Sequence, residues 1–355
     1  MNREQIQATA LSAIEHKSRA GLDISMGVGK TYIGLQYLTR HKGNFLVVAP
    51  KRDIFQSWID DATKFNLSDT LSRITFSTYL SLTKHDPDDY SVVILDEAHN
   101  TKENHLSFLD NFNGKVLGLT GTPPKWLDSD KGRIMEKYYP IVFSYKVDNA
   151  VEHGILNDYS IFIHNLALSS DKSIKTSQGW YTSEQKQYDW ITGQLEQAFS
   201  ERDKFFRQIQ RINYLKQFET KENYVKQVLG IIPKDEKCLV FANTTDQADR
   251  ICDHSHHSKR KSTDLDDFKK GNITRLAAVE QLSEGVTIPN LKHIIIMHAY
   301  GNEKRASQKI GRALRLNPDD KSRIHVLCYK DTIDETWVKR ALDGFNKDKI
   351  FTARI

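Results

Sequence analysis

The stretch LDISMGVGKTYIGLQYL, residues 22–38, joins a short apolar segment to a glycine-containing turn and then to an amphipathic run. The turn closes with Gly29, Lys30 and Thr31, the order that ends a phosphate-binding loop. In such a loop, backbone N–H groups at a helix N-terminus hold phosphate, the lysine reaches the terminal phosphates, and the threonine binds Mg²⁺. The full spacing asks for a small residue where this chain has Ile24, so a chance helix start remains the alternative.

An acidic pair favours the phosphate-binding interpretation. The run SVVILDE, residues 91–97, is strand-like and ends in Asp96 and Glu97. A carboxylate pair at a strand end after a phosphate-binding loop is the second half of an ATPase site. Asp96 would hold Mg²⁺ through water, and Glu97 would orient and deprotonate the attacking water. The two segments together predict ATP hydrolysis that requires Mg²⁺.

Short apolar runs continue the pattern along the chain. The first set is NFLVVAP (44–50), SVVILDE (91–97) and KVLGLTGTP (115–123), and the second is KCLVFAN (237–243), TRLAAVE (274–280), KHIIIMHA (292–299) and RIHVLCY (323–329). Short apolar runs that alternate with amphipathic stretches predict buried parallel strands joined by helices. We therefore expect an α/β fold with two doubly wound sheets, whose ligands gather beyond the carboxyl ends of the strands.

The segment between the two sets has a different composition. Residues 182–229 are rich in Gln, Lys, Glu and aromatic residues and predict two or three helices. The aromatic stripe of these helices favours core packing over ligand binding; its members are Tyr188, Phe199, Phe206 and Tyr214. We expect a first boundary near residues 145–165. The predicted division is residues 1–150, a linker and helical insert over residues 151–232, and residues 233–355.

Composition limits the class of protein. A chain of 355 residues has room for about two domains at roughly 150 residues each. No apolar run approaches the roughly 18 residues of a membrane span, and the start lacks the apolar core of a signal peptide, so we expect a cytoplasmic protein. The net charge of +5 permits a polyanionic partner without requiring one. Cys238, Cys252 and Cys328 lie too far apart for a Cys-x-x-Cys pair and are expected to be buried thiols.

Further segments follow a recognisable order. They are QIQATAL (5–11), SMGVGKT (25–31), LVVAPKRDIFQSW (46–58), ITFSTYLSL (74–82), LDEAHN (95–100), LTGTP (119–123), CLVFANT (238–244), LSEGVTIP (282–289) and QKIGRALR (308–315). Over residues 3–340, this order resembles the motifs of a superfamily 2 helicase of the DEAH-box kind. The resemblance implies two tandem RecA-like domains with a helical insert between them, ATP and Mg²⁺ as cofactors, and a nucleic-acid partner.

The resemblance also assigns residues to the nucleotide. Gln7 resembles the adenine-reading glutamine, with Gln5 as the alternative. The family commonly tolerates a residue such as Ile24 at the start of its phosphate-binding loop. The loop contacts would come from Met26, Gly27, Val28, Gly29, Lys30 and Thr31. Thr31 and Asp96 would hold Mg²⁺, and the residues that couple hydrolysis to movement would be His99, Thr120 and Thr122.

The second domain would complete the site. Arg312 and Arg315 are three residues apart, which places both on one helical face, and the resemblance makes them arginine fingers for the γ-phosphate. Gln308 would complete the cleft, and Gly285 would contact the nucleotide. Thr287 stands where the family often has an acidic residue, so a ribose contact is in doubt.

Candidate nucleic-acid contacts lie in both halves of the chain. By resemblance, Lys51, Arg52 and Thr78 would contact the phosphate backbone, and a solvated surface is the alternative for the two cations. The basic run HSHHSKRKS, residues 254–262, suits either a phosphate track or a solvated loop. No cysteine or acidic residue is spaced to complete a metal site with its histidines.

The substrate is expected to be DNA. RNA helicases of the DEAH kind usually add large C-terminal domains, whereas this chain ends soon after its last motif and resembles compact UvsW-type, phage-encoded and Swi/Snf-like DNA translocases. We therefore expect an ATP-dependent helicase or translocase that remodels duplex or branched DNA, for example by branch migration. Single-stranded DNA is a further candidate substrate. The expected setting is a bacterial or phage-infected cell. Alternatives are an RNA helicase, an ATP-switched binding module, and a motor subunit for a nuclease; recombination and replication proteins are other partner classes. Trp180, Tyr181 and Trp190 are stacking candidates at a fork, although core packing is favoured for each.

Overall fold

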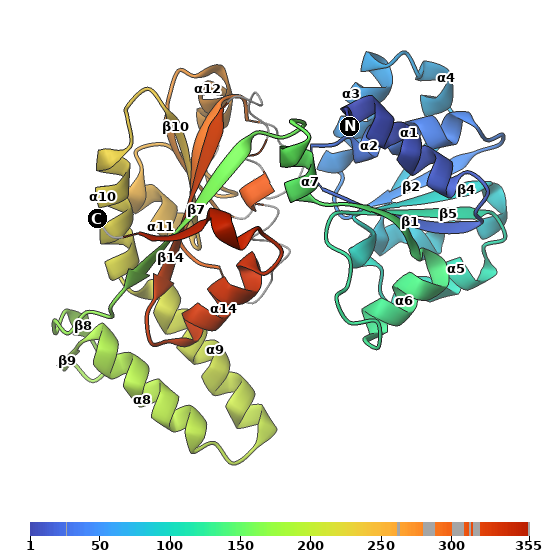
Figure 1. Cartoon of the computed structure of the whole chain (residues 1–355). Coiled ribbons are helices and arrows are strands. Elements are labelled where there is room, and N and C mark those ends of the chain that lie inside the picture. The colour runs from blue at the N-terminus through green and yellow to red at the C-terminus, as the bar shows by residue number, and fades with distance from the viewer. Residues whose placement is uncertain are drawn as a thin grey trace. The chain divides into compact units, whose positions relative to one another are not determined.

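The chain folds into two compact units. The computed structural model describes residues 1–25, 27–260, 263–279, 288–299, 309–311, 314 and 320–353. The chain passes from the first unit to the second between Asp158 and Tyr159 (Figure 1). Each unit contains a predominantly parallel sheet and several helices, so the predicted α/β fold class is confirmed.

The first unit is built on a six-stranded sheet in the order β3-β2-β4-β5-β1-β6, in which each neighbouring pair is parallel. The strands are β1 (Arg19–Ile24), β2 (Phe45–Ala49), β3 (Ile74–Thr78), β4 (Val92–Asp96), β5 (Lys115–Thr120) and β6 (Ile141–Tyr145). Every residue of β2 and β4 is buried, as expected for strands covered on both faces. The three apolar runs of this half are therefore strands, as predicted.

Helices precede, connect and follow these strands. They are α1 (Arg3–Ile14), α2 (Lys30–Thr39), α3 (Asp53–Lys64), α4 (Ser68–Leu71), α5 (Leu106–Asn111), α6 (Asp130–Tyr138) and α7 (Val147–Glu152), with 3₁₀ turns η1 (Tyr79–Lys84), η2 (Pro87–Asp89), η3 (Ala98–Asn100) and η4 (Glu103–His105). Helix α1 begins with a capping box formed by Asn2 and Gln5. Helix α3 buries Ile54, Trp58 and Ala62, which are spaced four residues apart and so share one face.

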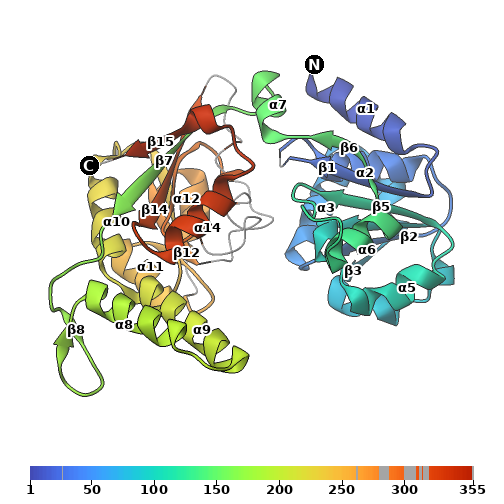
Figure 2. The same ribbon diagram turned by 60° about the horizontal axis from the view of Figure 1, so that its bottom comes forward.

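The second unit contains a seven-stranded sheet in the order β11-β12-β10-β13-β14-β7-β15. The strands are β7 (Asp158–Leu166), β10 (Lys237–Ala242), β11 (Ser255–His256), β12 (Arg275–Val279), β13 (Leu291–Ile296), β14 (Lys321–Tyr329) and β15 (Ile350–Ala353). Figure 2 shows β7 between β14 and β15. The four predicted runs each contain a strand, but β7 was not predicted, because its range was assigned to a linker and helical insert.

The helices of the second unit include the predicted helical segment. They are α8 (Glu184–Glu196), α9 (Glu201–Gln217), α10 (Thr220–Ile231), α11 (Thr245–Ile251), α12 (Asp264–Lys270) and α14 (Ile333–Leu342), with the 3₁₀ turn η6 (Lys347–Lys349) and a small sheet of β8 (Ile174–Lys175) and β9 (Tyr181–Thr182). Helix α10 contributes Val225 and Val228 to the same core as Val240 of β10 and Leu327 of β14. The segment at 184–231 therefore packs as part of the second unit.

The predicted aromatic stripe is only partly correct. Tyr188 is buried, and Tyr214 packs against the core, whereas Phe199 is fully exposed and Phe206 is 70% exposed. Helices α8 and α9 form a hairpin that lies at one end of the unit in both views (Figures 1 and 2). Phe199 lies between the two helices, whereas Phe206 lies on α9. Because a helix in such a hairpin is covered mainly along one face, apolar residues on its other face stay exposed.

The predicted burial of three aromatic residues near this hairpin also needs correction. Trp180, Tyr181 and Trp190 were expected in the core, but all three are mostly exposed to solvent. Trp180 and Tyr181 lie at the small β8–β9 sheet, which has only two strands and therefore has little surface to cover them.

A chain of polar side chains crosses the second sheet. Tyr224 Oη lies 2.8 Å from His164 Nδ1, and His164 Nε2 lies 3.0 Å from His325 Nδ1. His325 Nε2 lies 3.4 Å from His293 Nδ1, and His293 Nε2 lies 2.7 Å from Glu236 Oε2. One proton assignment satisfies all four contacts: each histidine is neutral, protonated at Nε2, and donates toward Glu236.

The three cysteines are buried free thiols, as predicted. Burial raises the pKa of Cys252 and of Cys328 to about 12, and it also raises the pKa of Cys238. In the described part of the chain, no helix has both the length and the apolar character needed to cross a membrane.

Candidate functional site

The turn between β1 and α2 has the backbone of a phosphate-binding loop. Gly27 and Gly29 adopt φ angles of 86° and 104°, a left-handed region in which a side chain is strained. A Cβ atom at Gly29 would also lie only 2.6 Å from Gln7 Nε2. Lys30 opens helix α2, and its Nζ donates a long hydrogen bond of 3.3 Å to the carbonyl of Ile24. The loop thus places backbone N–H groups, a helix N-terminus and a lysine together.

Gln7 reaches this loop from helix α1. It is buried, and its Nε2 donates a hydrogen bond of 2.8 Å to the carbonyl of Val28. The alternative, Gln5, is exposed, and its side chain accepts the backbone N–H of Asn2 in the helix cap. The structure therefore places Gln7, and not Gln5, at the predicted nucleotide loop.

The acidic pair stands at the carboxyl end of β4. Asp96 Oδ1 accepts the backbone N–H of Glu97 at 2.9 Å, and Asp96 Oδ2 accepts Trp58 Nε1–H at 2.9 Å. Burial, together with the neighbouring charge of Glu97, raises the pKa of Asp96 to about 6. Glu97 Oε1 lies 3.7 Å from Lys30 Nζ, and Glu97 has a φ angle of 49°. Left-handed non-glycine residues of this kind cluster at functional sites.

His99 joins this pair to the end of β5. Its Nδ1 lies 3.0 Å from Thr120 Oγ1, 3.3 Å from Thr122 Oγ1 and 3.4 Å from Glu97 Oε2. The backbone N–H of Thr122 donates to Thr120 Oγ1 at 3.1 Å. The predicted coupling residues therefore form one polar cluster with Glu97.

The donor set fits a nucleotide with Mg²⁺. Asp96 supplies a carboxylate, and Thr31, directly after Lys30, supplies a hydroxyl; Mg²⁺ in nucleotide sites is held by one or two such groups and by phosphate oxygens. Among the described residues, no group of three or more histidine, cysteine, aspartate or glutamate side chains is arranged to hold a metal ion. Ser25 Oγ, at the start of the loop, is buried without a hydrogen-bond partner.

The candidate nucleic-acid residues lie at the same edge of the first sheet. Lys51 and Arg52 are exposed and follow β2, while Thr78 is half-buried at the end of β3. Strands β2 and β3 are paired so that Ala49 lies opposite Thr78. The three side chains therefore come from neighbouring strand ends.

Several predicted site residues lie outside the described residues. They are Met26, Gly285, Gln308, Arg312 and Arg315. Thr287, the departure from the expected motif, lies there as well. The roles assigned to them stay predictions.

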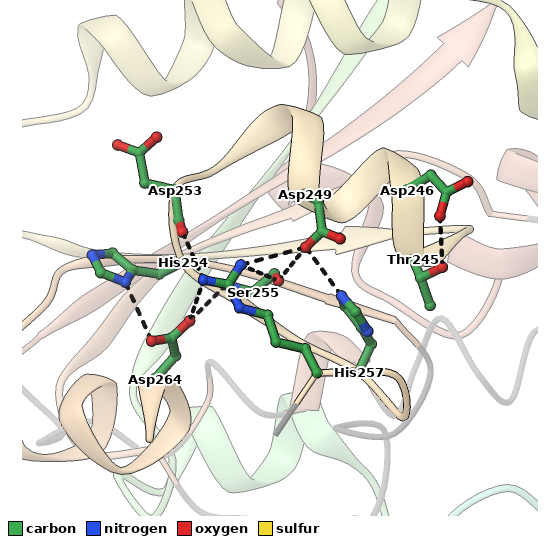
Figure 3. Close-up of polar contacts among 9 residues, drawn as sticks. Thr245, Asp246, Asp249, Asp253, His254, Ser255, His257 and Asp264 are labelled. Atoms are coloured by element: carbon green, nitrogen blue, oxygen red, sulfur yellow. Dashed lines mark hydrogen bonds and ion pairs between the residues drawn. The ribbon is translucent and has the colours of Figure 1, made fainter. Parts of the chain in front are cut away.

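Some side chains of the basic run at residues 254–262 contact acidic residues of their own unit, and Figure 3 shows the contact of His257. His257 Nε2 lies 3.0 Å from Asp249 Oδ1. Arg260 lies 3.5 Å from Asp249 and 3.6 Å from Asp264. His257 is also buried. The carboxylates of Asp249 and Asp264 therefore face His257 and Arg260, and the choice between a phosphate track and a solvated loop stays a prediction.

Two site residues were missed by the sequence analysis. Trp58 donates to the Asp96 carboxylate, and Tyr79 Oη donates to the Asp96 backbone carbonyl at 2.9 Å. Ile54 and Trp58 recur at a spacing of four, which predicts only that both face the core. No local pattern indicates which polar group a buried tryptophan meets.

Comparisons with known proteins agree with this geometry. A family described as "Type III restriction enzyme, res subunit" matches residues 1–125, and a family described as "Helicase conserved C-terminal domain" matches residues 220–317. The DNA 3'-5' translocase XPB2 of Sulfurisphaera tokodaii is 23% identical over 92% of this chain and 82% of its own length.

Solved structures share the fold. The helicase domain of Hef from Pyrococcus furiosus has a TM-score of 0.52 and 15% identity, over 95% of this chain and 96% of that domain. The DNA-bound Type ISP restriction-modification enzyme LlaBIII has a TM-score of 0.63 and 14% identity, over 98% of this chain but only 30% of its own chain. Two family models, one of them described as a helicase domain, thus match separate parts of the chain, and the fold of a helicase domain extends over 95% of it.

Proposed function

We propose that this protein is an ATP-driven DNA helicase or translocase. The observation that carries the proposal is the convergence of Lys30, Asp96 and Glu97 at the carboxyl edge of the first sheet, beside a loop with two left-handed glycines. The similarity to a relative named as a DNA 3'-5' translocase supports DNA as the substrate.

Each residue of the site has a role in this proposal. Gln7 fixes the loop through the Val28 carbonyl and reads the adenine, and Lys30 turns from the Ile24 carbonyl to the terminal phosphates. Asp96 and Thr31 hold Mg²⁺, which when bound neutralises the developing phosphate charge. Glu97 orients the attacking water and accepts its proton.

The remaining roles belong to coupling and to the second unit. His99 lies between Glu97 and the threonines Thr120 and Thr122. A change at Glu97, the proposed general base, therefore alters the end of β5. In this proposal Arg312 and Arg315 stabilise the transition state, with Gln308 and Gly285 contributing to the nucleotide cleft. Arg315→Ala is expected to abolish turnover with little change in nucleotide affinity.

The finer substrate is duplex or branched DNA. The predicted similarity to UvsW-type and Swi/Snf-like proteins supports remodelling of forks and branch migration, with backbone contacts from Lys51, Arg52 and Thr78. An RNA substrate is the competing hypothesis. The ATPase assay described below distinguishes RNA from DNA as the substrate.

A second candidate is a motor that works with a nuclease partner. The family match at residues 1–125 is to a restriction-enzyme subunit, and the structurally similar LlaBIII is a restriction-modification enzyme. In this reading the chain supplies ATP-driven movement, and a partner supplies DNA cleavage.

The deciding experiment is steady-state ATPase activity at one salt concentration, because nucleic-acid binding depends strongly on salt. The rates are compared with no nucleic acid, single-stranded DNA, duplex DNA, a four-way junction and RNA. Stimulation by duplex or junction DNA is expected and would lead to a branch-migration assay. Stimulation by RNA alone would replace the proposal with an RNA helicase, and no stimulation by any of them would contradict a stand-alone nucleic-acid motor.

A further inference from the structure

Trp58 links two parts of the first unit that the proposed mechanism treats separately. Its side chain is completely buried on α3, and its indole N–H donates to Asp96 Oδ2 at 2.9 Å. The other carboxylate oxygen, Oδ1, accepts the backbone N–H of Glu97. Because each oxygen has its own donor, the plane of the Asp96 carboxylate is fixed, and one of the two donors belongs to α3.

The start of α3 is continuous with the candidate DNA-contacting segment. The backbone N–H of Ile54 donates to the carbonyl of Lys51 at 3.3 Å, and that of Phe55 donates to the carbonyl of Arg52 at 3.0 Å. These bonds join Lys51 and Arg52 to the first turn of α3. A displacement of this turn is therefore passed to α3 as a whole, including Trp58.

The indole is also held against the helix of the phosphate-binding loop. A Cβ atom at Gly34 of α2 would lie only 2.6 Å from Cη2 of Trp58 and 3.3 Å from a methyl group of Leu119. The ring therefore packs so closely against Gly34 that a larger residue would not fit there unless the ring moved. The hydrogen bond from the indole N–H to Asp96 offers a direct route by which a movement of α3 reaches the carboxylate.

We propose that Trp58 is a positioning residue that couples DNA contact at the start of α3 to the orientation of the Asp96 carboxylate. This inference rests on the proposed function, since it assumes that DNA binds near Lys51 and Arg52 and that Asp96 holds Mg²⁺. Trp58 touches neither DNA nor nucleotide in this account. It transmits a change at the DNA-contacting turn to Asp96, the proposed Mg²⁺ ligand.

The first test replaces the indole N–H and keeps an aromatic ring. In Trp58→Phe, the concentration of Mg²⁺ needed for half-maximal nucleotide binding, measured with a fluorescent ATP analogue, is expected to rise about tenfold, because a hydrogen bond to a charged group is lost. Stimulation of the ATPase by duplex DNA is expected to fall by about the same factor, while DNA affinity stays unchanged. Trp337→Phe is the matched control, since Trp337 is a buried tryptophan of the second unit and should leave both values as they are.

The second test uses the wild-type protein, so it remains decisive if the variant does not fold. The chain has five tryptophans and therefore at most five indole N–H signals in a ¹⁵N-labelled sample. The signal that is missing in Trp58→Phe, or that selective labelling assigns to Trp58, is expected to shift when duplex DNA is added without nucleotide. The Trp337 signal should shift less.

The outcomes separate the inference from the proposed function. If Glu97→Gln is inactive and DNA stimulates the wild type, but Trp58→Phe keeps normal Mg²⁺ dependence and normal stimulation, the coupling role is wrong and the motor function stands. An unmoved Trp58 signal at saturating DNA would overturn the inference in the same way. If no nucleic acid stimulates the wild type, the proposed function fails and the inference fails with it.

Discussion

The two units both contain predominantly parallel sheets but place their polar residues differently. In the first unit, Lys30, Asp96, Glu97 and His99 gather where strands end, beside left-handed backbone. In the second unit, the described polar chain from Tyr224 to Glu236 runs across the sheet, and its six histidine ring nitrogens all have partners.

This difference distinguishes a candidate ligand site in the first unit from a structural hydrogen-bond network in the second. Polar groups at strand ends face a loop where a ligand can replace a weak contact, as with the long bond from Lys30 to the Ile24 carbonyl. Polar groups across strands are already satisfied by one another, so they stabilise the fold. The four predictions that follow test this distinction, beginning with the largest effect.

Glu97→Gln should reduce ATP turnover by about 10² to 10⁴, because it removes the proposed general base. Nucleotide and Mg²⁺ binding should persist, since Lys30 and Asp96 remain. The matched change is Glu236→Gln, at a carboxylate that accepts a hydrogen bond from His293 in the second unit. Single-turnover ATP hydrolysis is measured for both variants. Wild-type turnover in Glu97→Gln would contradict the assignment of the site.

Lys221→Met should destabilise the second unit by about 3 to 5 kcal/mol, because it leaves a buried charge without its partner. Lys221 Nζ lies 2.5 Å from Asp334 Oδ2 and also donates to the Met297 carbonyl at 2.8 Å, and both charged side chains are buried. Urea unfolding measures the loss. The double variant Lys221→Met with Asp334→Leu should recover much of it, and a single variant as stable as the wild type would contradict the assignment.

Acid should weaken the second unit through its histidines. Burial lowers the pKa of His164 to about 4 and that of His325 to about 3, whereas an unfolded histidine titrates near 6.5. Below that value the unfolded chain binds more protons than the folded one, so stability is fully present above about pH 6.5 and falls as the pH drops toward 4. Each histidine contributes a slope of up to about 1.4 kcal/mol per pH unit.

The measurement is urea unfolding at a series of pH values, for the wild type and for His325→Phe. The variant lacks the central histidine, so its stability should depend less steeply on pH. An unchanged slope would show that the polar chain does not cause the acid sensitivity.

The smallest effect is expected at the exposed face of the α8–α9 hairpin. Phe206→Ala should change stability by less than about 0.5 kcal/mol, because the ring is largely exposed. Tyr188→Ala, on the buried side of α8, should cost about 3 to 5 kcal/mol, by analogy with other large core aromatics. Thermal unfolding compares the pair, and a large loss in Phe206→Ala would indicate a contact that covers this face.

Local sequence predicted seven of the strands and the position of the acidic pair at a strand end. The runs at 44–50, 91–97 and 115–123 became strands because each is short and apolar, and strand ends placed Asp96 beside the loop of Lys30. The exposed position of Phe206 could not be predicted, because periodicity does not reveal how many neighbours a helix has. The Trp58–Asp96 bond joins residues 38 positions apart and depends on tertiary packing alone.

The three buried cysteines make the chain suitable for site-specific labelling. Maleimide reagents react with thiolates, and thiols with a pKa near 12, such as those of Cys252 and Cys328, are almost fully protonated at neutral pH. New cysteines at the exposed positions Asn111 and Lys226 would therefore be modified in preference to the native ones. A fluorescent pair attached there, one dye on each unit, would report the distance between the units while ATP is being consumed.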